Sequence, residues 1–74
     1  MVHGIYFKTK PKNRWQLFSI AISPEAAVKE VNDCKLQISS QGNDKAEVAV
    51  QIFETIFYIP EYMNDLINQP ILYN

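Results

Sequence analysis

Cysteine, histidine and glycine are scarce in this chain, and their scarcity excludes several kinds of site. The 74 residues include one cysteine, one histidine and two glycines. Cys34 alone cannot form an internal disulfide, and Cys34 with His3 cannot supply the four ligands of a structural zinc ion. Two isolated glycines cannot build a glycine-rich phosphate loop. We therefore expect no metal and no cofactor.

Long apolar runs and a large net charge are also missing. No stretch approaches the roughly 20 apolar residues that cross a bilayer, and the first residues lack the pattern of a secretory signal. Seven basic and eight acidic side chains give a net charge of −1. These features predict a soluble, cytoplasmic protein. One domain over 1–74 buries only a modest core, so self-association would add stability.

Two β-rich segments begin the chain. Residues 3–9 and 14–22 are rich in β-branched and aromatic residues and flank a turn at 10–13, which predicts a β-hairpin. Strand alternation places Ile5 and Phe7 on the core face of the first strand. The side chains expected on the core face of the second strand are Phe18, Ile20 and Ile22. The side chains expected on the opposite face include Tyr6, Trp15 and Leu17.

A helix is predicted from Pro24 to about Ser40. Ser23 can cap its free N–H groups, and Pro24 lacks the N–H that the first turn leaves unpaired. One apolar stripe follows at helical spacing, and its members are Ala27, Val31, Cys34 and Ile38. Gly42 stands where a chain leaving a helix often needs a positive φ.

The stretch 46–59 fits both a helix and a strand. A helical stripe runs from Ala49 to Phe57, but β-branched residues alternate with others over 46–53. We favour a strand over 46–53, because a lone hairpin is marginal in water and a third strand gives the helix a sheet to cover. A short amphipathic turn or helix is then predicted from Pro60 to Pro70, followed by the apolar tail 71–74.

Together these elements predict an α+β fold. It is a two-layer ββαβ sandwich with a short C-terminal helix, in which one helix covers one face of a small three-stranded sheet that is antiparallel or mixed. A right-handed crossover from the second strand to the third places the strands in the order 2-1-3, with antiparallel neighbours.

Charge is divided unevenly along the chain. Residues 1–22 contain four basic side chains and no acidic one, and these are Lys8, Lys10, Lys12 and Arg14. Residues 46–74 contain four acidic side chains and no basic one. Basic residues interleaved with Tyr6 and Trp15 could bind single-stranded nucleic acid through phosphate contacts and base stacking. The simpler interpretation is a solvated hairpin tip whose lysines discourage aggregation.

Aromatic side chains on the uncovered sheet face suggest a protein contact. Tyr6 and Trp15, with Leu17, are typical anchors of interfaces if they remain exposed, whereas the C-terminal segment could instead fold over them. We therefore predict a non-enzymatic interaction or adaptor domain that binds a protein partner or itself, with nucleic-acid binding as the alternative.

The sequence gives only weak indications of a catalytic site. His3 is close to the terminus, Cys34 is on the predicted core stripe, and carboxylate pairs such as Glu30/Asp33 and Glu61/Asp65 are typical of solvated helix faces. We assign no catalytic residue.

Overall fold

The computed structural model describes residues 1–10, 14–42, 45–66 and the backbone of 71–72. Its elements follow in the order β1 (Val2–Lys8), β2 (Trp15–Ala21), α1 (Pro24–Ser40), β3 (Glu47–Phe53), β4 (Tyr62–Met63) and β5 (Ile71–Leu72). The predicted hairpin and helix are confirmed. Within the ambiguous stretch 46–59, the strand favoured over 46–53 is confirmed as β3, Glu47–Phe53.

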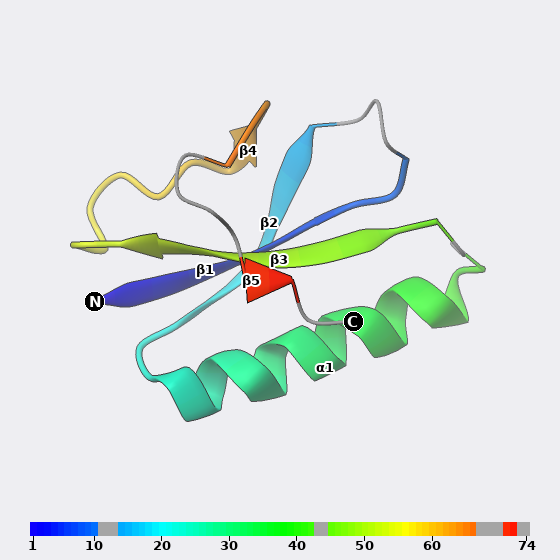
Figure 1. Cartoon of the computed structure of the whole chain (residues 1–74), viewed down its shortest axis with the longest axis horizontal. Coiled ribbons are helices and arrows are strands. Elements are labelled where there is room, and N and C mark those ends of the chain that lie inside the picture. The colour runs from blue at the N-terminus through cyan, green and yellow to red at the C-terminus, as the bar shows by residue number, and fades with distance from the viewer. Residues whose placement is uncertain (11–13, 43–44, 67–70, 73–74) are drawn as a thin grey trace.

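The strands form one sheet in the order β4-β2-β1-β3-β5, and every neighbouring pair is antiparallel. The predicted order 2-1-3 is therefore confirmed for the three long strands. Helix α1 lies along one face of this sheet (Figure 1). The molecule is a small α+β domain with one helix packed on an antiparallel sheet.

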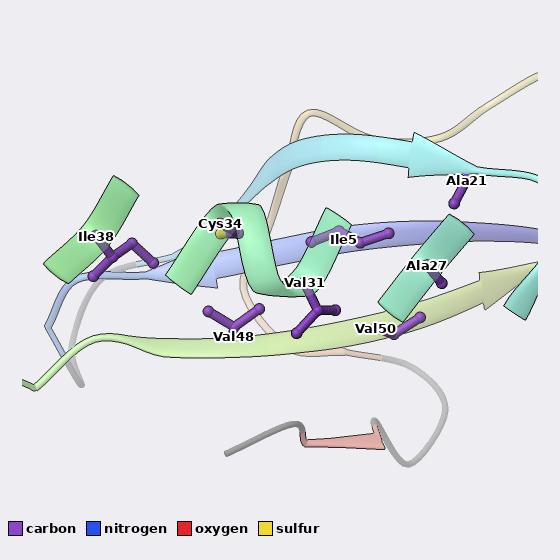
Figure 2. Packing of buried hydrophobic residues seen from close by; sticks show 8 residues of the cluster. All are labelled: Ile5, Ala21, Ala27, Val31, Cys34, Ile38, Val48 and Val50. Atoms are coloured by element: carbon purple, nitrogen blue, oxygen red, sulfur yellow. The ribbon is translucent and has the colours of Figure 1, made fainter. Parts of the chain in front are cut away.

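Helix α1 forms because its sequence supplies a residue suited to each end of the helix and an apolar stripe for its buried side. Ser23 Oγ accepts a hydrogen bond from the Ala26 N–H at 3.1 Å, and Pro24 opens the first turn. The predicted stripe is buried against Ile5, Ala21, Val48 and Val50 of the sheet (Figure 2). We call these residues the helix-side cluster, and its helical members are Ala27, Val31, Cys34 and Ile38. Gly42 has a φ of 77°, as its position after the helix predicted.

Strand β2 contains an irregularity that corrects the predicted core. Ile5 pairs with Ser19, but Tyr6 pairs with Leu17, so Phe18 is an extra residue in the ladder. A β-bulge of this kind reverses the alternation of side chains beyond it. Ala21 therefore belongs to the helix-side cluster, and the prediction that Ile20 and Ile22 are core residues is wrong. Their side chains are 38% and 79% exposed.

The C-terminal helix predicted from Pro60 is also wrong within the residues described. Residues 60–66 contain strand β4 and bends instead. In a helix the carbonyls of Pro60 and Glu61 would accept bonds four residues ahead, but here they accept bonds from Tyr6 and Leu17. Ile71–Leu72 pairs with β3 at Ala49 and Val50. The remaining predicted positions, 67–70 and 73–74, lie outside the described residues.

No helix found in the described ranges is long and apolar enough to cross a membrane.

Candidate interaction surface

The sheet face opposite α1 holds a second core, which we call the outer cluster. It consists of Tyr6, Trp15, Ala49 and Met63, and the partly buried residues around it are Leu17, Phe53, Ile59 and Leu66. Tyr6 is 0% exposed and Trp15 is 7% exposed. The prediction that these two rings remain exposed for a partner is therefore wrong. Leu17, the third predicted anchor, is half-buried beside them.

Residues 59–63 cover the outer cluster, and we call them the strap. The Tyr6 hydroxyl donates a hydrogen bond to the Pro60 carbonyl at 2.5 Å, and the Leu17 N–H donates to the Glu61 carbonyl at 2.8 Å. Met63 then pairs with Trp15 in the ladder between β4 and β2. Burial raises the pKa of Tyr6 to about 12, because removal from water disfavours the phenolate. The strap thus seals the rings that the charge and aromatic pattern had suggested for binding.

Two basic residues of the hairpin contact aromatic rings, and one of these rings is Trp15 of the outer cluster. Lys8 Nζ lies 4.7 Å from the centroid of the Trp15 ring and 3.5 Å from a carboxylate oxygen of Glu47. The Arg14 guanidinium carbon lies 4.6 Å from the centroid of the Tyr62 ring. Lys10 is exposed, and Lys12 lies outside the described residues. Bases could stack on Tyr6 or Trp15 only if the strap opened, so the predicted basic and aromatic residues form no ready stacking platform.

Several exposed apolar side chains lie instead toward the end of the sheet where β1 begins. We call these residues the apolar end, and they are Met1, Ile20, Ile22, Ile56, Phe57 and Tyr58. Strand pairing explains the grouping, because Val2 lies opposite Phe53 and Gly4 lies opposite Ile20. The connection from β3 to β4 leaves the sheet close to the N-terminus (Figure 1). The apolar end therefore combines the start of β1, the end of β2 and this connection.

The connection itself carries the most exposed members. Tyr58 is 96% exposed and Phe57 is 74% exposed. The Phe57 N–H donates a hydrogen bond to Thr55 Oγ1 at 3.3 Å, a local bond that orders the turn before the two rings. Sequence reasoning missed Ile56, Phe57 and Tyr58 as surface residues. The sequence pattern gave no signal for this exposure, because the helical stripe from Ala49 to Phe57 includes two of the three residues.

The titratable residues considered for catalysis do not assemble into a reactive site. Cys34 is fully buried, and burial raises the pKa of its thiol to about 11. Glu30 accepts a hydrogen bond from Ser19 Oγ at 3.0 Å, which joins α1 to β2. His3 Nδ1 is buried, and the structure gives it no hydrogen-bond partner. In the part of the chain that the structure describes, no three His, Cys, Asp or Glu side chains are grouped to hold a metal ion.

Comparison with protein-family models, with curated proteins and with solved structures found no match.

Proposed function

We propose that this chain is a non-enzymatic interaction domain that contacts another protein surface through its apolar end. The observation that carries this proposal is the exposure of Ile56, Phe57 and Tyr58 as three consecutive large apolar side chains. Each Å² of apolar surface left in water forgoes roughly 25 cal/mol. The domain already folds Ile59 and Met63 of the same segment into its outer cluster. Burial against a second surface would recover the stabilisation that the three exposed side chains forgo.

The connection suits this role because it is held at both ends. Phe53 and Ile59 pack on the outer cluster, while the Tyr6 hydroxyl fixes Pro60. Only the five residues between them extend outward, and the bond from Phe57 to Thr55 orders their first turn. A short, anchored loop loses little conformational entropy on binding. Aromatic side chains are also enriched among the residues that dominate binding energy.

The test replaces all three exposed side chains with serine in one variant, Ile56→Ser/Phe57→Ser/Tyr58→Ser. We expect a thermal midpoint close to that of the wild type, because surface substitutions usually change stability by less than about 0.5 kcal/mol each. We expect at least about a tenfold loss of affinity for any purified partner, or of self-association, measured by calorimetry or sedimentation.

The matched control is Leu36→Ser on α1, since Leu36 is 69% exposed but lies away from the apolar end. It should leave association unchanged. Retention of full affinity by the triple variant would contradict the proposal, and so would an equal loss in the control.

Nucleic-acid binding is the weaker candidate. Lys10 and Arg14 are exposed and could contact phosphates, but Trp15 is sealed. An oligonucleotide titration at low salt that changed Trp15 fluorescence, with affinity falling steeply as salt rises, would favour this candidate over the protein contact.

A further inference from the structure

Strand β2 has an outer edge that is only half covered. Strand β4 pairs with Trp15 and Gln16, and the Leu17 N–H reaches Glu61. Beyond this point, among the ranges that the structure describes, no strand lies beside the segment 19–21 on that side. An uncovered strand edge presents backbone donors and acceptors that pair best with another β-strand.

We propose that the partner at the apolar end is a second copy of this chain, whose β2 pairs antiparallel with the first across a twofold axis near Ile20. This inference rests on the proposed function and names the occupant of its surface. Pairing would place Ile20 opposite its own symmetry mate and Ser19 opposite Ala21. The two sheets would become one continuous sheet, with both copies of α1 on the same side.

Charge is the first reason for choosing a second copy. Natural edge strands are usually guarded by lysine or other charged residues, yet residues 15–23 contain no charged side chain. An isologous contact brings each residue close to its own kind, so a charged edge would oppose self-pairing and a neutral edge does not. The overall net charge of −1 adds little repulsion between copies.

The other edges of the sheet are less suited to this contact. Strand β3 already has β5 beside Ala49 and Val50. Strand β4 is two residues long, and the Arg14 guanidinium lies over the ring of Tyr62 at 4.6 Å, which places a positive charge at that edge. Among the described residues, the uncovered half of β2 carries no charged side chain of its own and is bordered by apolar side chains. The carboxylate beside it, that of Glu30, accepts a hydrogen bond from Ser19 Oγ at 3.0 Å.

Side-chain direction is the second reason. Ile20 lies opposite Gly4, whose missing side chain faces the rings of Tyr6 and Phe53. Ile20 therefore points to the outer face, the face on which Phe53 and Ile59 at the two ends of the connection also pack. On the helix side, Ser19 and Ala21 are small and leave room for an approaching strand. Pairing across the edge would bury the Ile20 side chain of both copies.

The experiment places a charge at the proposed twofold axis. Ile20 is partly exposed, so Ile20→Lys and Ile20→Glu should both fold. Sedimentation of the wild type from about 10 μM to about 1 mM should show a monomer–dimer equilibrium. Each variant alone should dimerise at least about tenfold more weakly, because like charges face each other across the axis. An equimolar mixture of the two should recover association, because opposite charges then meet.

Leu36→Lys and Leu36→Glu are the matched controls, with the same charges on an exposed position of α1. They should dimerise like the wild type and show no recovery on mixing. Amide exchange gives a second readout, in which protection of the segment 19–22 should rise with protein concentration while that of α1 stays constant.

Three results would overturn the inference: a wild type that stays monomeric up to about 1 mM, dimerisation that Ile20→Lys leaves unchanged, or a mixture that recovers nothing. The proposed function fails separately. If the wild type is monomeric but binds a different partner, and the triple serine variant loses that binding, the second copy is excluded as the occupant. The apolar end then remains the contact surface.

Discussion

The two faces of the sheet bury their side chains in different ways. On one face a regular helix covers small aliphatic residues, and every helical member of that cluster follows the helical repeat. On the other face an irregular strap covers the larger side chains of Tyr6, Trp15 and Met63. The helix-side cluster needs only a periodic apolar stripe. The outer cluster depends on individual bonds, above all those that hold Pro60 and Glu61.

This difference predicts unequal consequences for stability. Helix α1 contacts all three long strands, whereas the strap contacts the sheet through a two-residue strand, two further hydrogen bonds and the packing of Ile59 and Met63. Regions with few such contacts open locally before the whole protein unfolds. The helix side should therefore report global unfolding, and the strap side should open first.

The largest effect is expected from truncating the helix-side cluster. Ile5→Ala should lower the free energy of unfolding by about 3 kcal/mol, because Ile5 is fully buried under α1. Met63→Ala should cost about 2 kcal/mol, because the strap can relax around the smaller side chain. Urea denaturation measures both values.

Thiol labelling of Cys34 separates the two faces further. The thiol is buried in the helix-side cluster with its pKa raised to about 11, so it should react only when α1 lifts from the sheet. Ile5→Ala should accelerate labelling far more than Met63→Ala. Equal acceleration by both variants would show that the faces open as one unit.

An intermediate loss of stability is expected from a substitution at Gly4 on β1, where the outer cluster leaves no room for a side chain. A Cβ added at Gly4 would lie 2.9 Å from Tyr6 Cε1 and 3.0 Å from Phe53 Cε2. Both rings would have to shift, so Gly4→Ala should destabilise the protein by about 2 kcal/mol and change the near-UV circular dichroism of Tyr6.

Gly42→Ala provides the contrasting glycine. Its added Cβ meets nothing within 4 Å, and only the φ of 77° opposes it. That variant should lose about 1 kcal/mol with no change in the near-UV spectrum. A Gly4→Ala protein with wild-type stability and spectrum would mean that the outer cluster is not closely packed.

The smallest effect is expected from the single bond between Tyr6 and the strap. Tyr6→Phe keeps the ring but removes the hydrogen bond to the Pro60 carbonyl, which should cost about 1 kcal/mol. Tyr58→Phe is the control, because Tyr58 is exposed and should contribute nothing.

The pH dependence follows from the same hydroxyl. The unfolded pKa of tyrosine is about 10, and burial raises the folded pKa of Tyr6 to about 12. Between these values the folded state holds a proton that the unfolded state has lost. The contribution of the Tyr6 hydroxyl to stability is therefore complete below pH of about 10 and is lost as pH rises through about 12. Denaturation across this range should show a steeper loss in the wild type than in Tyr6→Phe. Parallel curves would contradict the assignment.

Sequence reasoning succeeded where local periodicity carried the information. The cap at Ser23 and the four-residue stripe of α1 are set by neighbours along the chain, and the order of the three long strands follows from the handedness of one crossover. It failed at Ile20 and Ile22, because one extra residue in the ladder at Phe18 reversed their faces. A bulge leaves no mark in the alternation of apolar residues.

The candidate surface was only half predictable for a related reason. Tyr6 and Trp15 were placed on the correct face of the sheet, opposite the helix, but their exposure depended on where residues 59–63 lie. The hydrogen bonds from Tyr6 to Pro60 and from Leu17 to Glu61 join positions that are far apart in the chain, with Tyr6 and Pro60 separated by 54 residues. No spacing rule connects such positions, so the exposed loop of Ile56, Phe57 and Tyr58 became visible only in three dimensions.

The sequence by itself determined the repeating elements of this protein: a hairpin, a capped helix and a third strand, because each leaves a pattern of apolar repeats, turn residues or a cap within a short stretch of chain. The tertiary structure alone decided which aromatic rings are covered, where the ladder slips and which edge of the sheet stays open. Those outcomes depend on contacts between distant segments, where packing and backbone pairing override local preference.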